Sequence, residues 1–208
     1  MKSKLFIVLS VLLLFQSFCY AETTMTLKNP ETELSDLTSV CGDKAAMFIY
    51  SALTTDDTKI WNDFQYLKNH GISNVVVYVN SPGGYATTGF ALAGVFRWAQ
   101  DNGFNMTAYA SGIVASAAVP VYLAFDNRKA LNNVIFMIHE ASTEMSGTSS
   151  QFKSQSDMFD LMREQYFNIL IDRTNLKDRE QWERWERDTK WIGLSEAVEL
   201  GIVPKEEK

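Results

Sequence analysis

The sequence predicts an α/β protein built on a largely parallel β-sheet. Runs rich in valine, isoleucine and tyrosine alternate along the chain with longer runs whose apolar residues recur every three or four positions. This alternation is typical of strands joined by helical crossovers. One strand, Ile72–Val79, is apolar almost throughout, which indicates a strand covered on both faces, as in parallel sheets.

The first 21 residues have the pattern of a signal peptide. Lys2 and Lys4 precede an apolar run from Leu5 to Phe15, and the segment closes on a small residue, Ala21. This run is too short for a comfortable membrane span. We therefore predict cleavage after Ala21 and a secreted or periplasmic protein, membrane-anchored only if the signal is retained. The remaining 208 − 21 = 187 residues are enough for one domain with a sizeable core.

Charge and composition divide the rest of the chain into an arm and a domain. The leader carries two lysines and no acidic residue, so 19 − 2 = 17 basic residues face 25 acidic ones, a balance of −8. This charge argues against nucleic acid and anionic membrane surfaces as partners. Residues 22–43 are rich in Thr, Glu and Ser and predict a flexible polar arm. Residues 44–208 form the predicted domain.

The domain opens with a short strand, Ala46–Ser51, followed by a helix. That helix begins near Thr55, which two aspartates follow as a helix-start signal, and it ends before Gly71. Its apolar residues recur at helical spacing: Ile60, Trp61, Phe64 and Leu67. The buried strand then runs into the turn Asn80–Gly84, and a second helix is expected over Ala86–Gln100.

Strand and helix signals continue to alternate up to the C-terminus. The predicted elements are the strand Asn105–Ala110, the helix-like run Ala115–Phe125, the turn Asp126–Arg128, the strand Val134–Ile138, and helices over Gln151–Asp172, Asp178–Arg187 and Ser195–Leu200. The longest of these helices has apolar residues on a face broader than one core-facing stripe needs. Gly201 suits the C-terminal cap of the last helix.

Ser116 stands where the helix-like run begins, among small apolar neighbours. Backbone N–H groups at a helix start lack intrahelical partners, and the helix dipole favours negative charge there. A serine so placed can act as a nucleophile beside groups that stabilise an oxyanion. Serines at helix starts are more often caps or packing residues, so both interpretations stay open on this residue alone.

The turn Asn80–Gly84 exposes its backbone after a buried strand. Gly83 and Gly84 permit conformations and close approaches that a side chain would block. The turn is either an ordinary strand-to-helix connection or one wall of a peptide-binding cleft. Phosphate binding is disfavoured, because neither the full Walker pattern nor the full dinucleotide pattern is present.

The chain has only two histidines. His70 falls at the polar end of a helix, where it suits the helix dipole, and we interpret it as structural. His139 follows a buried strand, at the place where ligands bind in open α/β sheets. A serine hydroxyl is a poor nucleophile until a base takes its proton, so the combination of Ser116 and His139 favours catalysis.

A third group should hold the imidazole in the right tautomer. Glu140 is poorly placed, because successive strand residues point to opposite faces. Asp126 is conceivable. By charge pattern alone, Asp188 is a solvated helix end, and it becomes the preferred acid only through the resemblance described next. The Gly-x-Ser-x-Gly elbow is absent around Ser116, which argues against an α/β-hydrolase.

Four segments in register resemble the proteolytic subunit of the Clp proteases. They are the strand with Asn80–Gly84, the Gly112-x-x-Ala115-Ser116 turn, Met137–His139 and Ser195–Val203. Their order and spacing follow the family from Ala46 to Val203. The resemblance implies a spiral of ββα units, a fold shared with crotonases. It also implies that the helix over Gln151–Asp172 is a protruding handle and that the chain forms homo-oligomeric rings.

The resemblance further implies the site. The implied residues are Ser116, His139 and Asp188 as a Ser-His-Asp triad, the N–H groups of Gly84 and Ala117 as the oxyanion hole, and Gly83 and Gly84 as substrate-binding residues. Neither a metal nor a cofactor is expected.

The sequence departs from the family in several places. Pro120 falls within the predicted helix, where it would delete a backbone hydrogen bond. Ala118 replaces a usual glycine, and Asp188–Leu194 do not align cleanly. The family's cytoplasmic members are fed by ATP-driven unfoldases, and an exported chain would have no ATP. We therefore predict an ATP-independent serine endopeptidase that hydrolyses peptides or unfolded proteins without an unfoldase partner.

Three alternatives remain on the sequence. The first is a catalytically silent assembly module that keeps the oligomeric fold but lacks a competent triad. The second is a crotonase-like acyl-thioester enzyme, against which the Ser116 and His139 pair argues. The third is a Ser-Lys peptidase that would use Lys129 or Lys153, although no motif supports either lysine.

Overall fold

The computed structural model describes residues 34–54, 57–143 and 146–205. The predicted signal peptide, residues 1–21, and residues 22–33 of the predicted arm lie outside this part of the chain. No helix within the described residues combines the length and the apolar character that crossing a membrane requires.

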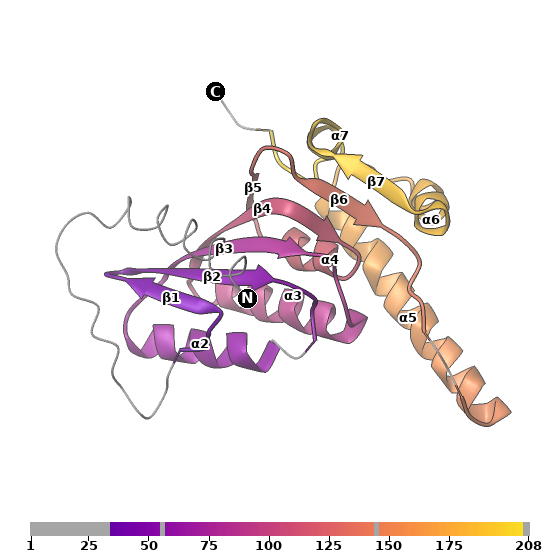
Figure 1. The fold of residues 1–208 in the computed structure, drawn as a ribbon, viewed down its shortest axis with the longest axis horizontal. Helices are drawn as coiled ribbons and strands as arrows, with labels where there is room; N and C mark the ends of the chain where they lie inside the picture. The colour runs from indigo at the N-terminus through magenta and orange to yellow at the C-terminus, as the bar shows by residue number, and fades with distance from the viewer. Residues whose placement is uncertain (1–33, 55–56, 144–145, 206–208) are drawn as a thin grey trace, which may run out of the picture. The chain divides into compact units, whose positions relative to one another are not determined.

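A seven-stranded sheet forms the centre of the fold (Figure 1). Its strands are β1 (Thr38–Cys41), β2 (Lys44–Tyr50), β3 (Asn74–Ser81), β4 (Asn105–Ala115), β5 (Asn127–Ala130), β6 (Ile135–Ile138) and β7 (Lys190–Gly193). The order across the sheet is β1-β2-β3-β4-β6-β7, and β5 also pairs with β4. The pairs within β2-β3-β4-β6 and between β4 and β5 are parallel, whereas β1 and β7 are antiparallel edges. The predicted α/β class with a largely parallel sheet is confirmed.

The helices match the periodic stretches of the sequence. They are α2 (Asp57–Asn69), α3 (Ala86–Asp101), α4 (Ala118–Leu123), α5 (Ser149–Arg173), α6 (Arg179–Asp188) and α7 (Leu194–Glu199). In Figure 1, α2 and α3 lie along one side of the sheet. Val75, Val77 and Val79 of β3 are buried on that side, with Phe64 of α2 and Phe96 of α3 in the same core.

The opposite side of the sheet is only half-buried in the described residues, although the sequence predicted cover on both faces of β3. Phe48, Tyr78 and Tyr109 lie opposite one another across β2, β3 and β4. Their rings stack at centroid distances of 5.6 and 5.7 Å. Such aromatic cross-strand contacts stabilise a sheet face without full burial.

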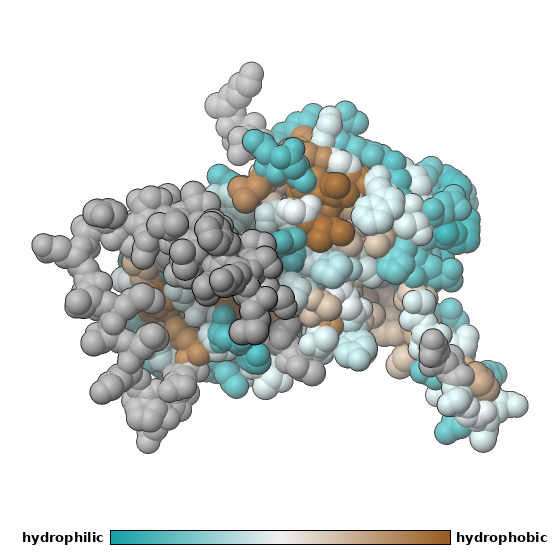
Figure 2. Space-filling model, viewed as in Figure 1, coloured by the Kyte–Doolittle hydropathy of each residue, from teal (hydrophilic) through white to brown (hydrophobic). Residues whose placement is uncertain are grey.

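The long helix α5 extends away from the sheet at its N-terminal end (Figure 1). Thr148 and Gln151 form a capping box there, which satisfies backbone groups at an exposed start. Only Phe167 and Leu170, near the C-terminal end, are buried. The predicted protruding helix is confirmed. Figure 2 shows its far half as mixed polar surface with apolar side chains among it.

Three strands, β1, β5 and β7, were not predicted from the sequence because they are short and lie at edges or carry polar residues. The strand β1 falls in the predicted arm, so the arm does not continue to residue 43. Asp63 of α2 is buried and accepts hydrogen bonds from the Ser35 backbone at 2.7 Å and from the Thr38 hydroxyl. The strand β5 replaces a predicted turn, because its backbone pairs with β4 whatever side chains it carries.

Pro120 is compatible with its helix. The sequence predicted a helix from about Ala115, in which a proline would remove an internal hydrogen bond. Instead β4 continues to Ala115 and α4 begins at Ala118. Pro120 therefore lies in the first turn, where backbone N–H groups have no intrahelical partner to lose.

Arg128 joins the ends of several elements from a buried position, with 8% of its surface exposed. Its guanidinium donates to the carbonyl oxygens of Phe125 (2.6 Å), Arg173 (3.1 Å), Gly201 (3.2 Å) and Ile202 (3.0 Å). Phe125 follows α4 and Arg173 ends α5, so the cation meets the negative ends of helix dipoles. Burial lowers the pKa of Arg128, and the carbonyl oxygens take the place of an acidic partner.

We expect Arg128→Met to destabilise the fold strongly. The carbonyl oxygens of Arg173, Gly201 and Ile202 would lose this donor, and that of Phe125 would keep only Arg173, which predicts a loss on the order of 3 kcal/mol and a fall in melting temperature of about 6–12 °C. Thermal unfolding followed by circular dichroism measures this. Lys129→Met is the matched control, since Lys129 is exposed and the substitution should change stability by less than about 0.5 kcal/mol. Equal melting temperatures for the two variants would contradict the role of Arg128.

Candidate active site

Ser116 occupies a constrained link between β4 and α4. Its φ is +54°, in the left-handed region that a non-glycine residue enters only when the surroundings impose it. Its N–H donates to the Met137 carbonyl of β6 at 2.8 Å, and the Val119 N–H donates to its carbonyl at 3.0 Å. These bonds fix the backbone and leave the half-buried hydroxyl free to point elsewhere.

His139 lies beside Ser116 because of the strand register. The strands β4 and β6 are parallel, and Ala115 pairs with Met137 at their C-terminal ends. Ser116 and His139 therefore both follow the same edge of the sheet. The distance from His139 Nε2 to Ser116 Oγ is 2.9 Å. This is the hydrogen-bond reach that a general base needs to take a hydroxyl proton.

The turn after β3 packs against Ser116. A Cβ on Gly83 would lie 2.6 Å from the Ala115 carbonyl oxygen and 2.7 Å from Ser116 Cβ, and one on Gly84 would lie 2.3 Å from the Leu53 carbonyl oxygen. The φ values of these glycines are +92° and +151°. Both steric space and backbone conformation therefore require glycine here.

Two backbone N–H groups at this junction lack a hydrogen-bond acceptor within the described residues. Leu53 anchors the outer side of the turn, donating to Gly83 O at 2.8 Å and accepting from Tyr85 N at 2.9 Å. Neither Gly84 N–H nor Ala117 N–H donates a hydrogen bond to any residue that the structure describes. These are the two predicted oxyanion donors, and unpaired N–H groups beside a nucleophile are what an oxyanion hole consists of.

Two residues of the same turn hold the site together, and the sequence analysis did not single them out. The side-chain oxygen of Asn80 accepts from the Ile113 N–H at 3.1 Å, beside Gly112 with its φ of +59°. The pairing of β3 with β4 shifts register at this point. The Asn80 side chain supplies the acceptor for a backbone N–H of β4 beside this shift, three residues before Ser116. Ser81 Oγ accepts from Gly83 N at 3.1 Å. Both residues belong to the Asn80–Gly84 turn that the sequence marks, and this was the available signal.

The structure does not bring the predicted acid to the histidine. Asp188 ends α6 and is exposed, and within the described part of the chain it shares no hydrogen bond or ion pair with His139. The other candidate, Asp126, is engaged elsewhere: its carboxylate accepts from Arg97 at 2.7 Å and Arg173 at 2.8 Å. Hydrogen bonding from Arg173 first, and then from Arg97, keeps the pKa of Asp126 below its usual value.

The remaining polar candidates also lie apart from the serine. Lys129 pairs with Tyr109, seven residues before Ser116 on β4, and Lys153 is exposed in the first turns of α5. The His70 ring stacks on the Tyr66 ring with 3.9 Å between their centroids, and His70 Nδ1 lies 2.8 Å from the Tyr66 carbonyl oxygen. Both contacts are in keeping with the predicted structural role. No cluster of three potential metal ligands occurs among the residues described.

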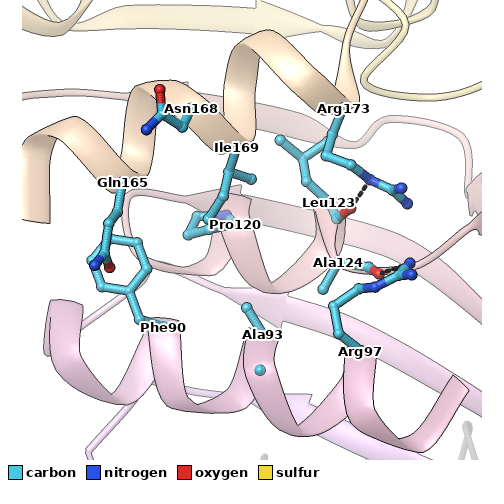
Figure 3. Close-up of a pocket in the computed structure, with 11 residues that line it drawn as sticks. Phe90, Ala93, Arg97, Pro120, Leu123, Ala124, Gln165, Asn168, Ile169 and Arg173 are labelled. Atoms are coloured by element: carbon cyan, nitrogen blue, oxygen red, sulfur yellow. Dashed lines mark hydrogen bonds between the residues drawn. The ribbon is translucent and has the colours of Figure 1, made fainter. Parts of the chain in front are cut away.

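A separate cavity of 430 Å³ lies between α3, α4 and α5 (Figure 3). Its middle is lined by Ala93, Pro120 and Ile169, and Arg97 and Arg173 stand at one end. Both arginines donate to backbone carbonyls of the α4 end, at Ala124 and Leu123. Neither Ser116 nor His139 lines this cavity, so it is distinct from the candidate active site.

Comparisons with known proteins agree on one family. A family model described as Clp protease matches residues 29–205. The ATP-dependent Clp protease proteolytic subunit 2 of Pseudomonas aeruginosa is 30% identical over 133 residues, which cover 63% of this chain and 64% of that protein. The subunit 2 of Treponema denticola is 26% identical with the same coverage. The chain thus spans less than two thirds of the length of these relatives.

A solved structure confirms the fold that the resemblance implied. A ClpP1 mutant from Listeria monocytogenes superimposes with a TM-score of 0.66, covering 76% of this chain and 88% of that one, at 22% sequence identity. At this identity the likeness concerns the fold. The positions of Ser116 and His139 and the contact between them come from this chain's own geometry.

Proposed function

The chain belongs to the Clp protease family, and from this premise we propose that it is an ATP-independent serine endopeptidase that hydrolyses peptides or unfolded proteins. The observation that carries the proposal is the 2.9 Å contact between Ser116 Oγ and His139 Nε2. Its setting adds support, because Ser116 is held at positive φ and two unpaired N–H groups adjoin it.

In the proposed reaction, Ser116 Oγ attacks the carbonyl carbon of the peptide bond while His139 Nε2 takes its proton. The carbonyl oxygen becomes an oxyanion, which the N–H groups of Gly84 and Ala117 stabilise. His139 then protonates the leaving amine, so the C–N bond breaks and an acyl ester remains on Ser116. Water, deprotonated by the same histidine, hydrolyses the ester and restores the serine.

Asp188 is the acid of the proposed triad. It shares no hydrogen bond with His139 in the described part of the chain, so its place in the triad rests on the resemblance to the Clp proteases. The variant Asp188→Asn distinguishes a Ser-His-Asp triad from catalysis by Ser116 and His139 alone. A triad requires most of the activity to disappear, because an amide favours the wrong imidazole tautomer. Full activity would remove Asp188 and leave Ser116 and His139 as the catalytic core.

The proposal includes assembly into homo-oligomeric rings through α5. Phe152, Met158 and Leu161 of this helix expose 43%, 41% and 67% of their surfaces. Exposed apolar side chains on a protruding helix fit a surface that a second copy of the chain covers. The absence of an Asp188 contact favours one alternative, a catalytically silent module that keeps this assembly. The crotonase-like alternative has no comparable support.

Export distinguishes the proposed protein from the relatives named above as ATP-dependent. The predicted signal peptide would place the chain in the periplasm or outside the cell, or at a membrane if the signal is retained. ATP is not available there, so an unfoldase partner is not expected. Chains that are already unfolded, or short peptides, are then the substrates that reach the site.

Hydrolysis without nucleotide tests this function. Purified protein lacking residues 1–21 should cleave fluorescently labelled casein, an unstructured substrate, at the same rate with and without ATP, and leave a stable folded protein intact. The Ser116→Ala variant should cleave neither. An assembled oligomer that cleaves no unstructured substrate would contradict the endopeptidase and favour the silent module.

A further inference from the structure

An ion pair joins the half-buried Arg163 of α5 to the buried Glu186 of α6, whose backbone contacts the segment that follows β6. Arg163 donates from Nε to Glu186 Oε2 at 2.7 Å, and its terminal nitrogen lies 2.7 Å from the same oxygen. The Glu186 side chain exposes only 6% of its surface. A carboxylate this deeply buried needs its partner, because an unpaired charge would be costly there.

The backbone of Glu186 ties this ion pair to the histidine segment. Its carbonyl accepts a hydrogen bond from the N–H of Glu140, the residue after His139, at 3.0 Å. The regular pairing of β6 with β7 ends at Ile138 and Lys190. The Glu140–Glu186 hydrogen bond therefore lies one step beyond the last strand pair. His139 is then held on both sides, by the strand pairing of Ile138 and by the hydrogen bond of Glu140.

The surroundings make this tie rigid. The Arg163 guanidinium lies over the buried Phe167 ring, 4.8 Å from its centroid, and Glu186 raises the pKa of Arg163. The same Glu186 carbonyl accepts from Thr189 N at 3.4 Å, which closes the end of α6. The helix end thus cannot shift without disturbing the ion pair, the cap and the Glu140 hydrogen bond together.

We propose that the Arg163–Glu186 pair is a positioning device for His139. It fixes the end of α6 against α5, and the Glu186 carbonyl then fixes the backbone on the far side of the histidine. Neither side chain touches the reacting atoms, so both are positioning residues. The inference rests on the proposed function, since it assigns His139 the role of base. It links the long helix to the geometry of that base.

The variant Glu186→Gln tests the device, with Glu164→Gln as the matched control. Glu164 accepts two hydrogen bonds from Arg179, at 2.7 and 2.5 Å, and so joins the same two helices through an exposed contact with no tie to His139. We expect Glu186→Gln to lower kcat for a fluorogenic peptide by about 10- to 100-fold with little change in KM, as displaced catalytic groups do. Glu164→Gln should leave both constants within about twofold of wild type.

A conservative variant and the double variant complete the test. Arg163→Lys keeps the charge but loses the fork geometry, and should retain more activity than Arg163→Met. The double variant Arg163→Met with Glu186→Gln should lose no more than Arg163→Met alone, since both changes break one interaction. Arg163→Lys also covers the case in which Glu186→Gln does not fold.

The rate of labelling by a fluorophosphonate probe separates this inference from the function it rests on. A wild-type protein that takes no label contradicts the proposed function itself. A labelled wild type with Glu186→Gln and Arg163→Met labelled at the same rate overturns the positioning role alone. Slower labelling in those two variants, with Glu164→Gln unchanged, supports it.

Discussion

Replacing either Ser116 or His139 by alanine should lower the rate of peptide hydrolysis by several orders of magnitude, toward about 10⁶-fold. The two side chains act as one unit across their 2.9 Å contact, since the hydroxyl attacks only when the imidazole takes its proton. Removing one partner therefore removes the contribution of both. For the same reason, the double variant should be no slower than either single variant. Steady-state hydrolysis of a fluorogenic peptide measures all three.

His70→Ala is the matched control for the histidine. His70 is exposed and stacks on Tyr66 at the end of α2, so its loss should leave the rate within about twofold of wild type. Melting temperatures show whether each variant folds. A folded His139→Ala variant with more than about a tenth of wild-type activity would contradict the role of His139 as the base.

Gly84→Ala should have the next largest effect on catalysis. A Cβ at this position would lie 2.3 Å from the Leu53 carbonyl oxygen and 2.7 Å from its nitrogen, both backbone atoms. Because backbone atoms cannot move aside cheaply, the turn must shift and carry the Gly84 N–H away from the oxyanion. Loss of one such donor costs about 10²- to 10³-fold in kcat. The KM should change far less, because the donor acts on the charge that develops in the transition state.

Gly94→Ala controls for the substitution itself. Gly94 lies within α3, and a Cβ there would meet no atom within 4 Å. Alanine should therefore leave activity unchanged and raise stability by about 1 kcal/mol, as glycine-to-alanine changes in helices do. If the Gly84→Ala variant keeps the wild-type kcat, the Gly84 N–H is not an oxyanion donor.

Long periodic segments were predictable from the sequence because burial imposes their pattern. The helix predicted over Ala86–Gln100 is α3, which runs from Ala86 to Asp101, and the predicted long helix is α5. Their apolar residues recur at helical spacing, so the sequence carries the information locally. The position of strand β3 was predicted equally well. Its burial was not, because both faces were predicted to be covered and the face that carries Tyr78 is only half-buried.

Short elements were missed because their partners, and not their own residues, decide their conformation. The strand Asn127–Ala130 contains two charged residues and pairs through its backbone with β4. The C-terminal end of β4 was also not predicted. The strand was expected to end at Ala110, but it continues to Ala115 across a register shift that Asn80 stabilises. Because α4 starts later than predicted, Pro120 lies in its first turn and removes no helical hydrogen bond.

The candidate site divides in the same way. Ser116 and His139 follow paired strands, so a strand-end argument placed them on one edge of the sheet, and the structure brings them together. The helix predicted over Asp178–Arg187 ends at Asp188 in the structure, but the left-handed φ of Thr189 just beyond it was not predicted. The orientation of Asp188 depends on that helix end, and its role as acid stays a prediction.

Mapping the covalent label of a fluorophosphonate probe tests the central claim most directly. These probes react only with a serine that is activated as a nucleophile, so the reaction reports on the Ser116–His139 pair without a known substrate. We expect a single labelled peptide carrying the probe on Ser116, and no label in the His139→Ala variant. An assembled, folded protein that takes no label, or takes it on another residue, would contradict the account.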